Sequence, residues 1–231
     1  MYEEFLAVCR HDENWARVFA YARSLAPSSG ARVTALVRKM SDAAIVDVGT
    51  PIRVVRCHTA LAESIGFHAA WADAVLIDAL VAEADLESIV CDGGRPCIVL
   101  PRGIQTPPAP RRIAVGWNGS LESMRALKSA LPLLRRAEHV VVFDAGRNPH
   151  EMCDAPPSAV TYLADHGIVA ARARSETGAG LGCRLAELAA EHSADLLVLG
   201  AYRHQRFSEW DSGAAIEQAL RIIDIPVLLR H

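Results

Sequence analysis

The sequence predicts an α/β protein made of two tandem, mostly parallel domains. Short apolar runs typical of buried strands alternate with segments of helical periodicity along most of the chain. Such alternation is typical of right-handed βαβ crossovers and a parallel sheet. The proline-rich stretch PRGIQTPPAPR, from Pro101 to Arg111, interrupts the pattern, which then begins again. We therefore expect one domain over residues 1–105 and a second over residues 106–231.

The first half contains five candidate strands. They are Phe5 to Cys9, Val33 to Val37, Ile52 to Val55, Ala72 to Ile77 and Cys97 to Leu100. Helical spacing predicts a helix from Trp15 to Leu25, a short helix at most between His58 and His68, and a helix from Leu80 to Cys91. Residues 38–71 leave room for little more than one strand and a short helix. We therefore expect the first half to have lost more of its helices and strands than the second half.

The second half repeats the order with clearer signals. Its candidate strands are Arg112 to Trp117, Val140 to Phe143, Ile168 to Ala171, Leu196 to Leu199 and Val227 to Leu229. Its candidate helices are one capped by Ser120 and running to Leu134, one ending near His166, one from Leu181 to His192, and one that opens at Ser212-Gly213 and ends before Pro226. Residues 144–157 are expected to form a loop.

Two local matches indicate that the halves are duplicates. The segment from Trp71 to Asp78 parallels that from Ser193 to Gly200, and RPCIVL at residues 95–100 parallels IPVLLR at residues 225–230. Each match is weak alone, because buried strands resemble one another in composition. Their common order on either side of one linker favours an internal repeat.

Composition excludes several classes of protein. The 231 residues are 51% hydrophobic, which is ample for a core, and the net charge of −3 gives no overall positive field for nucleic acid. The first residues are acidic where a signal peptide needs basic ones. No apolar run approaches the roughly 18 residues of a membrane span. We expect a cytoplasmic protein that contacts neither nucleic acid nor membrane.

Metal and nucleophile motifs are missing from the sequence. The six cysteines form no CxxC pair, which favours reduced thiols over a redox or metal role. The nine histidines show neither HxxH nor HExxH spacing. Ser120 lacks a surrounding GxSxG elbow, so a helix cap is the favoured role for its hydroxyl. The spacing therefore predicts no catalytic residue and no metal ligand.

The second half, from Arg112 to His231, resembles a universal stress protein domain, and the whole chain resembles a tandem member of that family. The resemblance is carried by RIAVGWNGS, LPLLRRAEHVVV, ADLLVLGAYRHQRFSEW and the closing IPVLLRH. It implies two tandem Rossmann-like domains of the adenine nucleotide alpha hydrolase-like type. Each would have a mostly parallel five-stranded sheet. The two would be related by a pseudo-twofold axis and packed through their closing strands, as in a fused homodimer.

The resemblance also implies a ligand site. In the nucleotide-binding branch of the family, the loop after the fourth strand reads Gly, two residues, Gly, nine residues, Gly, then Ser or Thr, and cradles the phosphates of ATP. The corresponding residues here are Gly200, Arg203, Gly213 and Ala214, of which two match. Arg203 could either obstruct the cradle or grip a phosphate itself. ATP binding is therefore expected to be weak or lost.

Two further positions follow from the resemblance. Asn118 occupies the place of a ribose-contacting Asp, and Phe143 lies where backbone groups meet the adenine. Asn118 can still donate and accept hydrogen bonds. In the first half, Asp78 stands where Gly200 stands in the second, and its carboxylate would repel a phosphate. We expect no nucleotide in the first half.

Two functional hypotheses remain open. The first is a non-enzymatic stress-response or regulatory protein whose state is tuned by a nucleotide. The second is a weak ATP hydrolase or nucleotidyl-transferring enzyme of the same architecture. Transfer chemistry needs a phosphate-gripping set of side chains on the first helix, and only Arg125 and Lys128 are present there. Homodimerisation and an unidentified protein partner also remain open.

Overall fold

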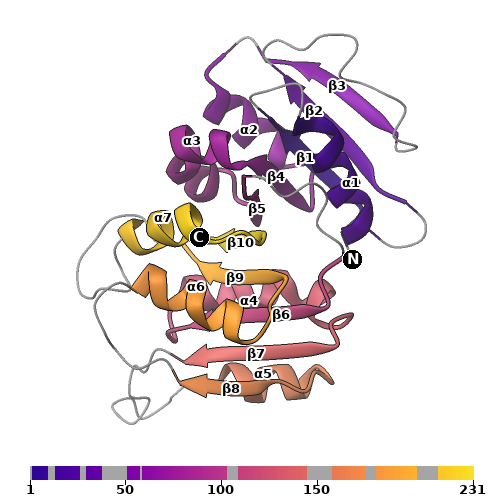
Figure 1. Cartoon of the computed structure of the whole chain (residues 1–231). Coiled ribbons are helices and arrows are strands. Elements are labelled where there is room, and N and C mark those ends of the chain that lie inside the picture. Colours follow the sequence, from indigo (N-terminus) through magenta and orange to yellow (C-terminus); the bar gives the residue numbers. More distant parts are fainter. Residues whose placement is uncertain are drawn as a thin grey trace. The chain divides into compact units, whose positions relative to one another are not determined.

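The computed structural model describes residues 2–9, 14–26, 30–37, 51–57, 59–102, 109–144, 158–174, 181–201 and 213–231, and the description below concerns these. The predicted α/β class is confirmed, with a mostly parallel sheet (Figure 1). Before the linker the elements are β1 (Glu4–Val8), α1 (Trp15–Leu25), β2 (Arg32–Val37), β3 (Ile52–Arg56), α2 (Leu61–Ala69), β4 (Ala74–Asp78), α3 (Ala79–Asp92) and β5 (Cys97–Leu100). After it come β6 (Arg112–Trp117), α4 (Leu121–Leu134), β7 (His139–Asp144), α5 (Ala159–Asp165), β8 (Ala171–Arg174), α6 (Leu181–Glu191), β9 (Leu196–Gly200), α7 (Gly213–Ile222) and β10 (Val227–Arg230).

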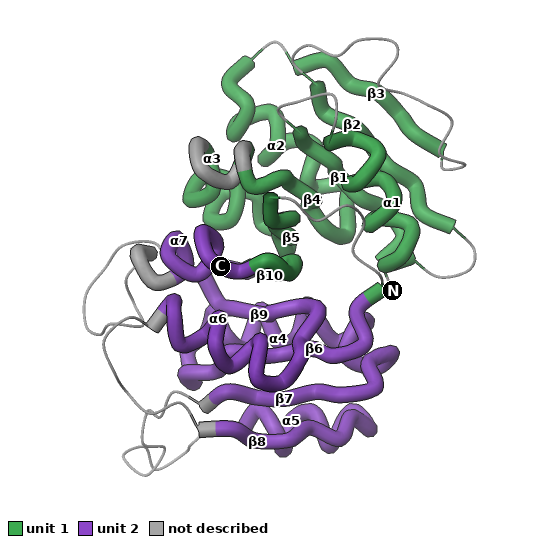
Figure 2. The backbone as a smooth tube through the Cα atoms, in the orientation of Figure 1, with its two compact units in different colours: residues 1–109, 224–229 green, residues 110–223, 230–231 purple. Residues whose placement is uncertain are grey.

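The chain divides into two compact units (Figure 2). Unit 1 comprises Met1–Ala109 and Asp224–Leu229, and unit 2 comprises Pro110–Ile223 and Arg230–His231. The strand order in unit 1 is β3-β2-β1-β4-β5-β10, and in unit 2 it is β8-β7-β6-β9. In each unit the first strand along the chain therefore lies between the second and the fourth. This shared winding places the carboxyl ends of the first and fourth strands side by side.

The last strand departs from the division expected from sequence. Although β10 follows all of unit 2 along the chain, it pairs antiparallel with β5, with Leu228 opposite Ile98. The closing strands of the two halves thus meet, as expected. Leu228 and Leu229 are fully buried. Burial of this apolar strand covers an edge of β5 that would otherwise expose unpaired backbone groups, and this accounts for its place in unit 1.

The strand predicted at Ile168 to Ala171 begins only at Ala171, because the residues before it close a helix. Gly167 has φ of +74°, its N–H donates to the Ala164 carbonyl at 2.9 Å, and the Ile168 N–H donates to the Leu163 carbonyl at 2.9 Å. These two bonds form a Schellman motif, in which a glycine takes the left-handed conformation and the next residue packs back on the helix. Ile168 is apolar because it covers the end of α5.

The interval between β2 and β4 is short in unit 1. Its described residues hold β3, five residues long and mostly exposed, and the nine-residue α2. The corresponding interval of unit 2 holds α5, β8 and α6. Residues 38–50 of this interval lie outside the described residues, so the expectation of a reduced third layer in unit 1 stays a prediction.

A similar carboxylate contact occurs in both units, through both oxygens of Asp195 in unit 2 and through Oδ2 alone of Asp73 in unit 1. The Asp195 side chain accepts the backbone N–H groups of Arg111 at 2.8 Å and Arg112 at 2.9 Å, at the start of β6. In unit 1 the Asp73 carboxylate accepts the N–H groups of Glu3 and Glu4 at 2.8 and 3.0 Å. Each Asp precedes the fourth strand of its unit and fixes the first strand beside it. The aspartates of the two matching sequence segments therefore have equivalent structural roles.

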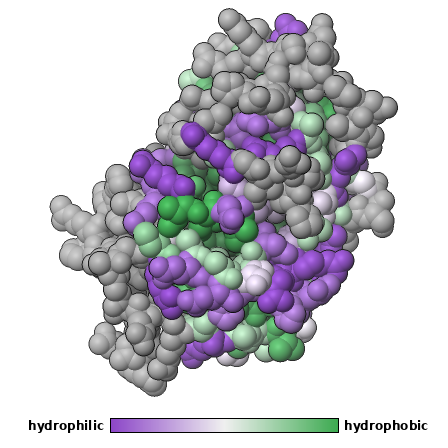
Figure 3. Space-filling view, in the orientation of Figure 1, coloured by the Kyte–Doolittle hydropathy of each residue, from purple (hydrophilic) through white to green (hydrophobic). Residues whose placement is uncertain are grey.

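The described helices also bear on the surface of the molecule. The longest, α3 and α4, have 14 residues each, and none of those described could span a bilayer. Figure 3 shows a group of apolar side chains near the middle of the viewed face. In α7, Ile222 is half exposed. The other face of α7 is buried through Ala219.

The paired Asp contact predicts a larger loss in unit 2 on substitution by Asn. Asp195→Asn replaces one of two oxygens that each accept a backbone N–H by an amide donor, whereas Asp73→Asn can keep both bonds on its one remaining oxygen. Asp195→Asn should lower the free energy of unfolding by about 1–2 kcal/mol, and Asp73→Asn should lower it by less. Asp165→Asn, at an exposed helix end, should change it by less than about 0.5 kcal/mol. Urea denaturation of the three variants would check this, and a neutral Asp195→Asn would contradict the structural role assigned to the contact.

The buried thiol of Cys97 predicts a loss of stability at alkaline pH. The described cysteines are free thiols, and Cys153 lies outside the described residues. Cys97 is fully buried in β5, and this burial raises the pKa of its thiol. Above about pH 8.5 the thiol ionises only in the unfolded chain, so unfolding is favoured as pH rises, by at most about 1.4 kcal/mol per pH unit. Unfolding measured from pH 7.5 to 10 should show a shallower pH slope for Cys97→Ala, whatever its absolute stability.

Candidate nucleotide-binding edge

The candidate site lies at the carboxyl edge of the unit 2 sheet. Gly116 of β6 is in register with Phe143 of β7, and Val115 of β6 is in register with Val198 of β9. The three parallel strands therefore end together. This register brings Asn118, Phe143 and Gly200 to one edge, where open α/β sheets bind ligands.

Gly200 lies against the first turn of α4. A Cβ atom at this position would be 2.5 Å from the Ser123 backbone nitrogen and 2.7 Å from the Glu122 carbonyl carbon. Real Cβ atoms do not approach backbone atoms so closely, so a side chain would separate β9 from α4. Gly200 is therefore needed here for close packing. Its role in the described structure does not depend on a ligand.

Asn118 and Ser120 build the turn from β6 into α4. The Asn118 Oδ1 accepts the Ser120 N–H at 3.1 Å, and Gly119 between them has φ of +73°. The Ser120 Oγ accepts the Ser123 N–H at 3.1 Å, which confirms its predicted role as the helix cap. The turn directs the N-terminus of α4, the positive end of its dipole, toward the carboxyl edge.

Phe143 contributes backbone rather than side chain to this edge. Its ring is fully buried and lies 5.5 Å from the His192 ring, centroid to centroid. A ring held in the core cannot stack on a base. This placement is compatible with the family resemblance, which assigns only backbone groups of this residue to the adenine.

The other three predicted positions follow β9 along the chain, and two of them belong to α7 rather than to the loop. Arg203 lies outside the described residues. Gly213 is the first residue of α7, and Ala214 follows it in the same turn. The described chain leaves β9 at Ala201, whose N–H donates to the Arg230 carbonyl at 2.9 Å and whose carbonyl is 3.0 Å from the His231 Nδ1. The C-terminal residues thus hold the start of the loop.

The equivalent edge of unit 1 is filled by its own residues. Asp78, only 1% exposed, is the last residue of β4, as Gly200 is the last residue of β9. Its Oδ1 accepts the Val81 N–H at 2.8 Å and so caps α3, while its Oδ2 accepts the Asn14 side-chain N–H at 3.1 Å. The carboxylate stands at the helix N-terminus, where an anion would otherwise be stabilised.

The Asp78 carboxylate also affects Cys9, which follows β1. Burial and then the negative charge of Asp78 raise the pKa of the Cys9 thiol, against an opposing effect of the Arg17 guanidinium. The thiol is therefore held in its neutral form. A further anion at this edge would be repelled by Asp78, as the sequence comparison of the two halves indicated.

Comparisons with known proteins bear on the fold. No family model matches the sequence, and no curated protein matches it. Among solved structures, a universal stress protein from Archaeoglobus fulgidus DSM 4304 superposes with a TM-score of 0.70 at 13% identity, over 98% of this chain and 97% of that one. A protein of unknown function from Pseudomonas aeruginosa PAO1 gives 0.60 at 13% identity, over 99% of this chain and 92% of the other. A putative universal stress protein from Pseudomonas aeruginosa UCBPP-PA14 gives 0.59 at 12% identity, over 99% and 93%.

These similarities establish the fold. The chain has the Rossmann-like fold of universal stress proteins over nearly its whole length, which confirms the resemblance inferred from sequence at the level of fold. At this level of identity the comparisons do not extend to a ligand or an activity.

Sequence analysis missed several contacts that fix the sheet. Asp73 and Asp195 bind the start of the first strand of their units, at the amino edge, although each stands at the same offset before the fourth strand of its half. The Asp78 bond to Asn14 joins residues 64 positions apart, and no local pattern announces it. The requirement for glycine at position 200 comes from its contact with Glu122 and Ser123 of α4, far earlier in the chain, and it too is visible only in the three-dimensional structure.

The close approach at Gly200 predicts an asymmetric response to added methyl groups. Gly200→Ala should lower the free energy of unfolding by about 1–3 kcal/mol, because β9 or α4 must shift. Gly66→Ala is a matched control inside α2, where the nearest described atom would be 3.9 Å from the new Cβ. It should stabilise the protein by about 0.5–1 kcal/mol through helix propensity. Equal stability changes in the two variants would contradict the close packing at Gly200.

Proposed function

We propose that this protein is a non-enzymatic regulatory protein of the universal stress type, in which only unit 2 binds an adenine nucleotide, and binds it weakly. The observation that carries the proposal is the difference between two equivalent positions. At the end of the fourth strand, unit 1 has a buried Asp78 that caps a helix, whereas unit 2 has Gly200 with no side chain. A carboxylate thus occupies one edge, and a backbone free of negative charge forms the other.

The described geometry of unit 2 supports a nucleotide more than another ligand. In this proposal Asn118 borders the ribose, the Phe143 backbone faces the adenine, and Gly200 with Gly213 bounds the phosphate loop. The N-terminus of α4 adds a favourable field for phosphate. The loop sequence keeps two of four positions, so we expect a Kd in the micromolar range or weaker, about −8 kcal/mol or less favourable.

The catalytic alternative has less support. The first turns of α4 hold Ser120, engaged as a cap, and Ser123, whose hydroxyl donates to the Ser120 carbonyl at 2.9 Å. Neither hydroxyl is paired with a general base in these bonds. Among the described residues no group of three or more His, Cys, Asp or Glu side chains is placed to hold a metal. A hydrolase or nucleotidyl transferase would need a general base or a metal ion supplied by other residues.

We further propose that the two units arose by duplication and act together as an intrachain pseudo-dimer in the cytoplasm. The repeated strand winding and the paired Asp73 and Asp195 contacts support common descent. Unit 1 would then have exchanged ligand binding for stability. A homodimer or a protein partner would transmit the nucleotide state of unit 2.

Calorimetric titration with ATP and ADP tests the nucleotide proposal. Wild-type protein should bind ATP with micromolar or weaker affinity. If Arg203 grips a phosphate, Arg203→Ala should weaken binding, and if it obstructs the cradle, Arg203→Gly should strengthen it. No heat for the wild type and both variants, with circular dichroism unchanged, would reject nucleotide binding and favour regulation by a protein partner.

A further inference from the structure

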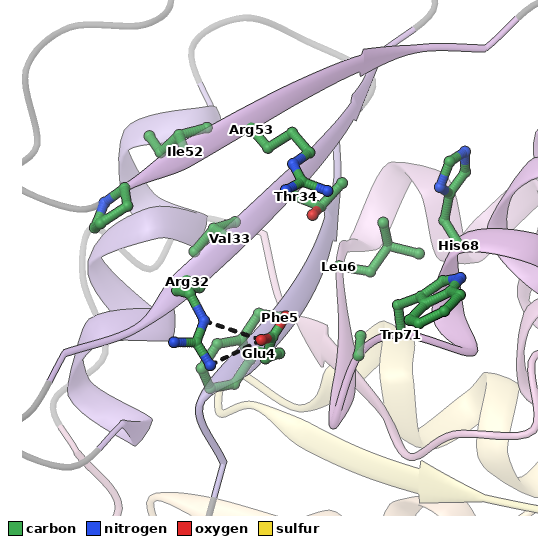
Figure 4. Close-up of a pocket in the computed structure, with 12 residues that line it drawn as sticks. Glu4, Phe5, Leu6, Arg32, Val33, Thr34, Ile52, Arg53, His68 and Trp71 are labelled. Carbon is green, nitrogen blue, oxygen red and sulfur yellow. Dashed lines mark hydrogen bonds and ion pairs between the residues drawn. The ribbon is translucent and has the colours of Figure 1, made fainter.

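A cavity is present at the amino edge of the unit 1 sheet. It has a volume of about 590 Å³ and opens where β1, β2 and β3 begin and where the chain passes from α2 to β4. Leu6, Thr34 and Arg53 are in register on the three strands and share one face. Figure 4 shows these side chains with His68 and Trp71 around the cavity. Its volume lies within the range of about 300–1,000 Å³ typical of small-molecule sites.

The charges that line the cavity leave one cation uncompensated. Arg32 pairs with Glu4 at 2.8 Å, which neutralises both. Arg53, on the exposed strand β3, makes no hydrogen bond or ion pair with any described residue. A guanidinium binds carboxylate through two parallel hydrogen bonds. Because Arg53 is then the one cation of the described lining left for a ligand, a single negative charge fits best.

The other wall of the cavity is aromatic. The Trp71 side chain is 79% exposed, although tryptophan is usually highly buried. Leu6, fully buried in β1, provides an apolar floor, and the His68 ring lies beside Trp71 (Figure 4). The C-terminus of α2 carries the negative end of the helix dipole. The Arg95 guanidinium compensates this charge, because its Nη2 donates to the Ala70 carbonyl at 2.7 Å. A planar ring could be covered by Trp71 while its acid group reaches Arg53.

We propose that this cavity binds a small aromatic carboxylate, with Arg53 contacting the acid group, Trp71 covering the ring and Thr34 offering a hydroxyl. The site is separate from the nucleotide region, because it lies at the amino edge of unit 1 and uses none of the residues of unit 2. The proposal for this cavity does not depend on nucleotide binding by unit 2.

Two pairs of variants test the proposal with indole-3-acetate as the probe and neutral indole-3-acetamide as its matched compound. Titration by saturation-transfer NMR should show that the wild type prefers the acid by at least fivefold. Arg53→Gln should abolish this preference. Arg56→Gln, three residues further along the same strand and therefore on its other face, should keep it.

The aromatic wall has its own control. Trp71→Ala should weaken binding of both compounds at least fivefold, whereas Phe67→Ala, which removes another exposed ring that does not line the cavity, should leave it unchanged. All four substitutions lie at exposed side chains, so thermal melts should confirm an intact fold. Absence of saturable binding by the wild type, or a preference for the acid that survives Arg53→Gln, would overturn the proposal.

Discussion

The close approach between the end of the fourth strand and the helix that follows the first strand is the constraint on which unit 2 depends. At Gly200 the backbone of β9 lies against the first turn of α4, with no room for a Cβ atom. That contact holds α4 beside the sheet, directs its N-terminus toward the carboxyl edge and leaves the edge lined by backbone. Close packing requires glycine at position 200, and a phosphate-binding loop would require glycine there as well.

Unit 1 meets the same geometric need differently. A side chain stands at the end of its fourth strand, and it is useful to the fold because Asp78 caps α3 and bonds to Asn14 ahead of α1. A carboxylate at a helix N-terminus stabilises that helix much as a bound anion would. In our proposal, the same carboxylate that excludes a ligand from unit 1 adds a structural contact to it. Both units keep the separate carboxylate contact made by Asp73 and Asp195, which supports the first strand and is remote from the carboxyl edge.

The sequence predicted the fold well because burial patterns are local. Strands such as Leu196–Gly200, and the Ser120 cap, were recognised from a few adjacent residues. Two features were not predictable in this way: the Ile168 contact that closes α5, and the cavity beside Arg53 and Trp71. The cavity is lined by residues that are distant in sequence. The Ile168 contact depends on a turn in which an apolar residue closes a helix. For the candidate site, the sequence identified Asn118, Phe143 and Gly200, which the structure brings to one edge, whereas Arg203 lies outside the described residues.

Hydrogen–deuterium exchange of the full chain, with and without saturating ATP, tests most directly whether only unit 2 binds nucleotide. The account predicts slower exchange in the turn from β6 into α4, around Asn118, and at the ends of β7 and β9. The equivalent amides of unit 1, after β1 and around Asp78, should exchange at the same rate in both conditions. Protection around Asp78, or equal protection at the two edges, would contradict the claim that the carboxylate has replaced the ligand in unit 1.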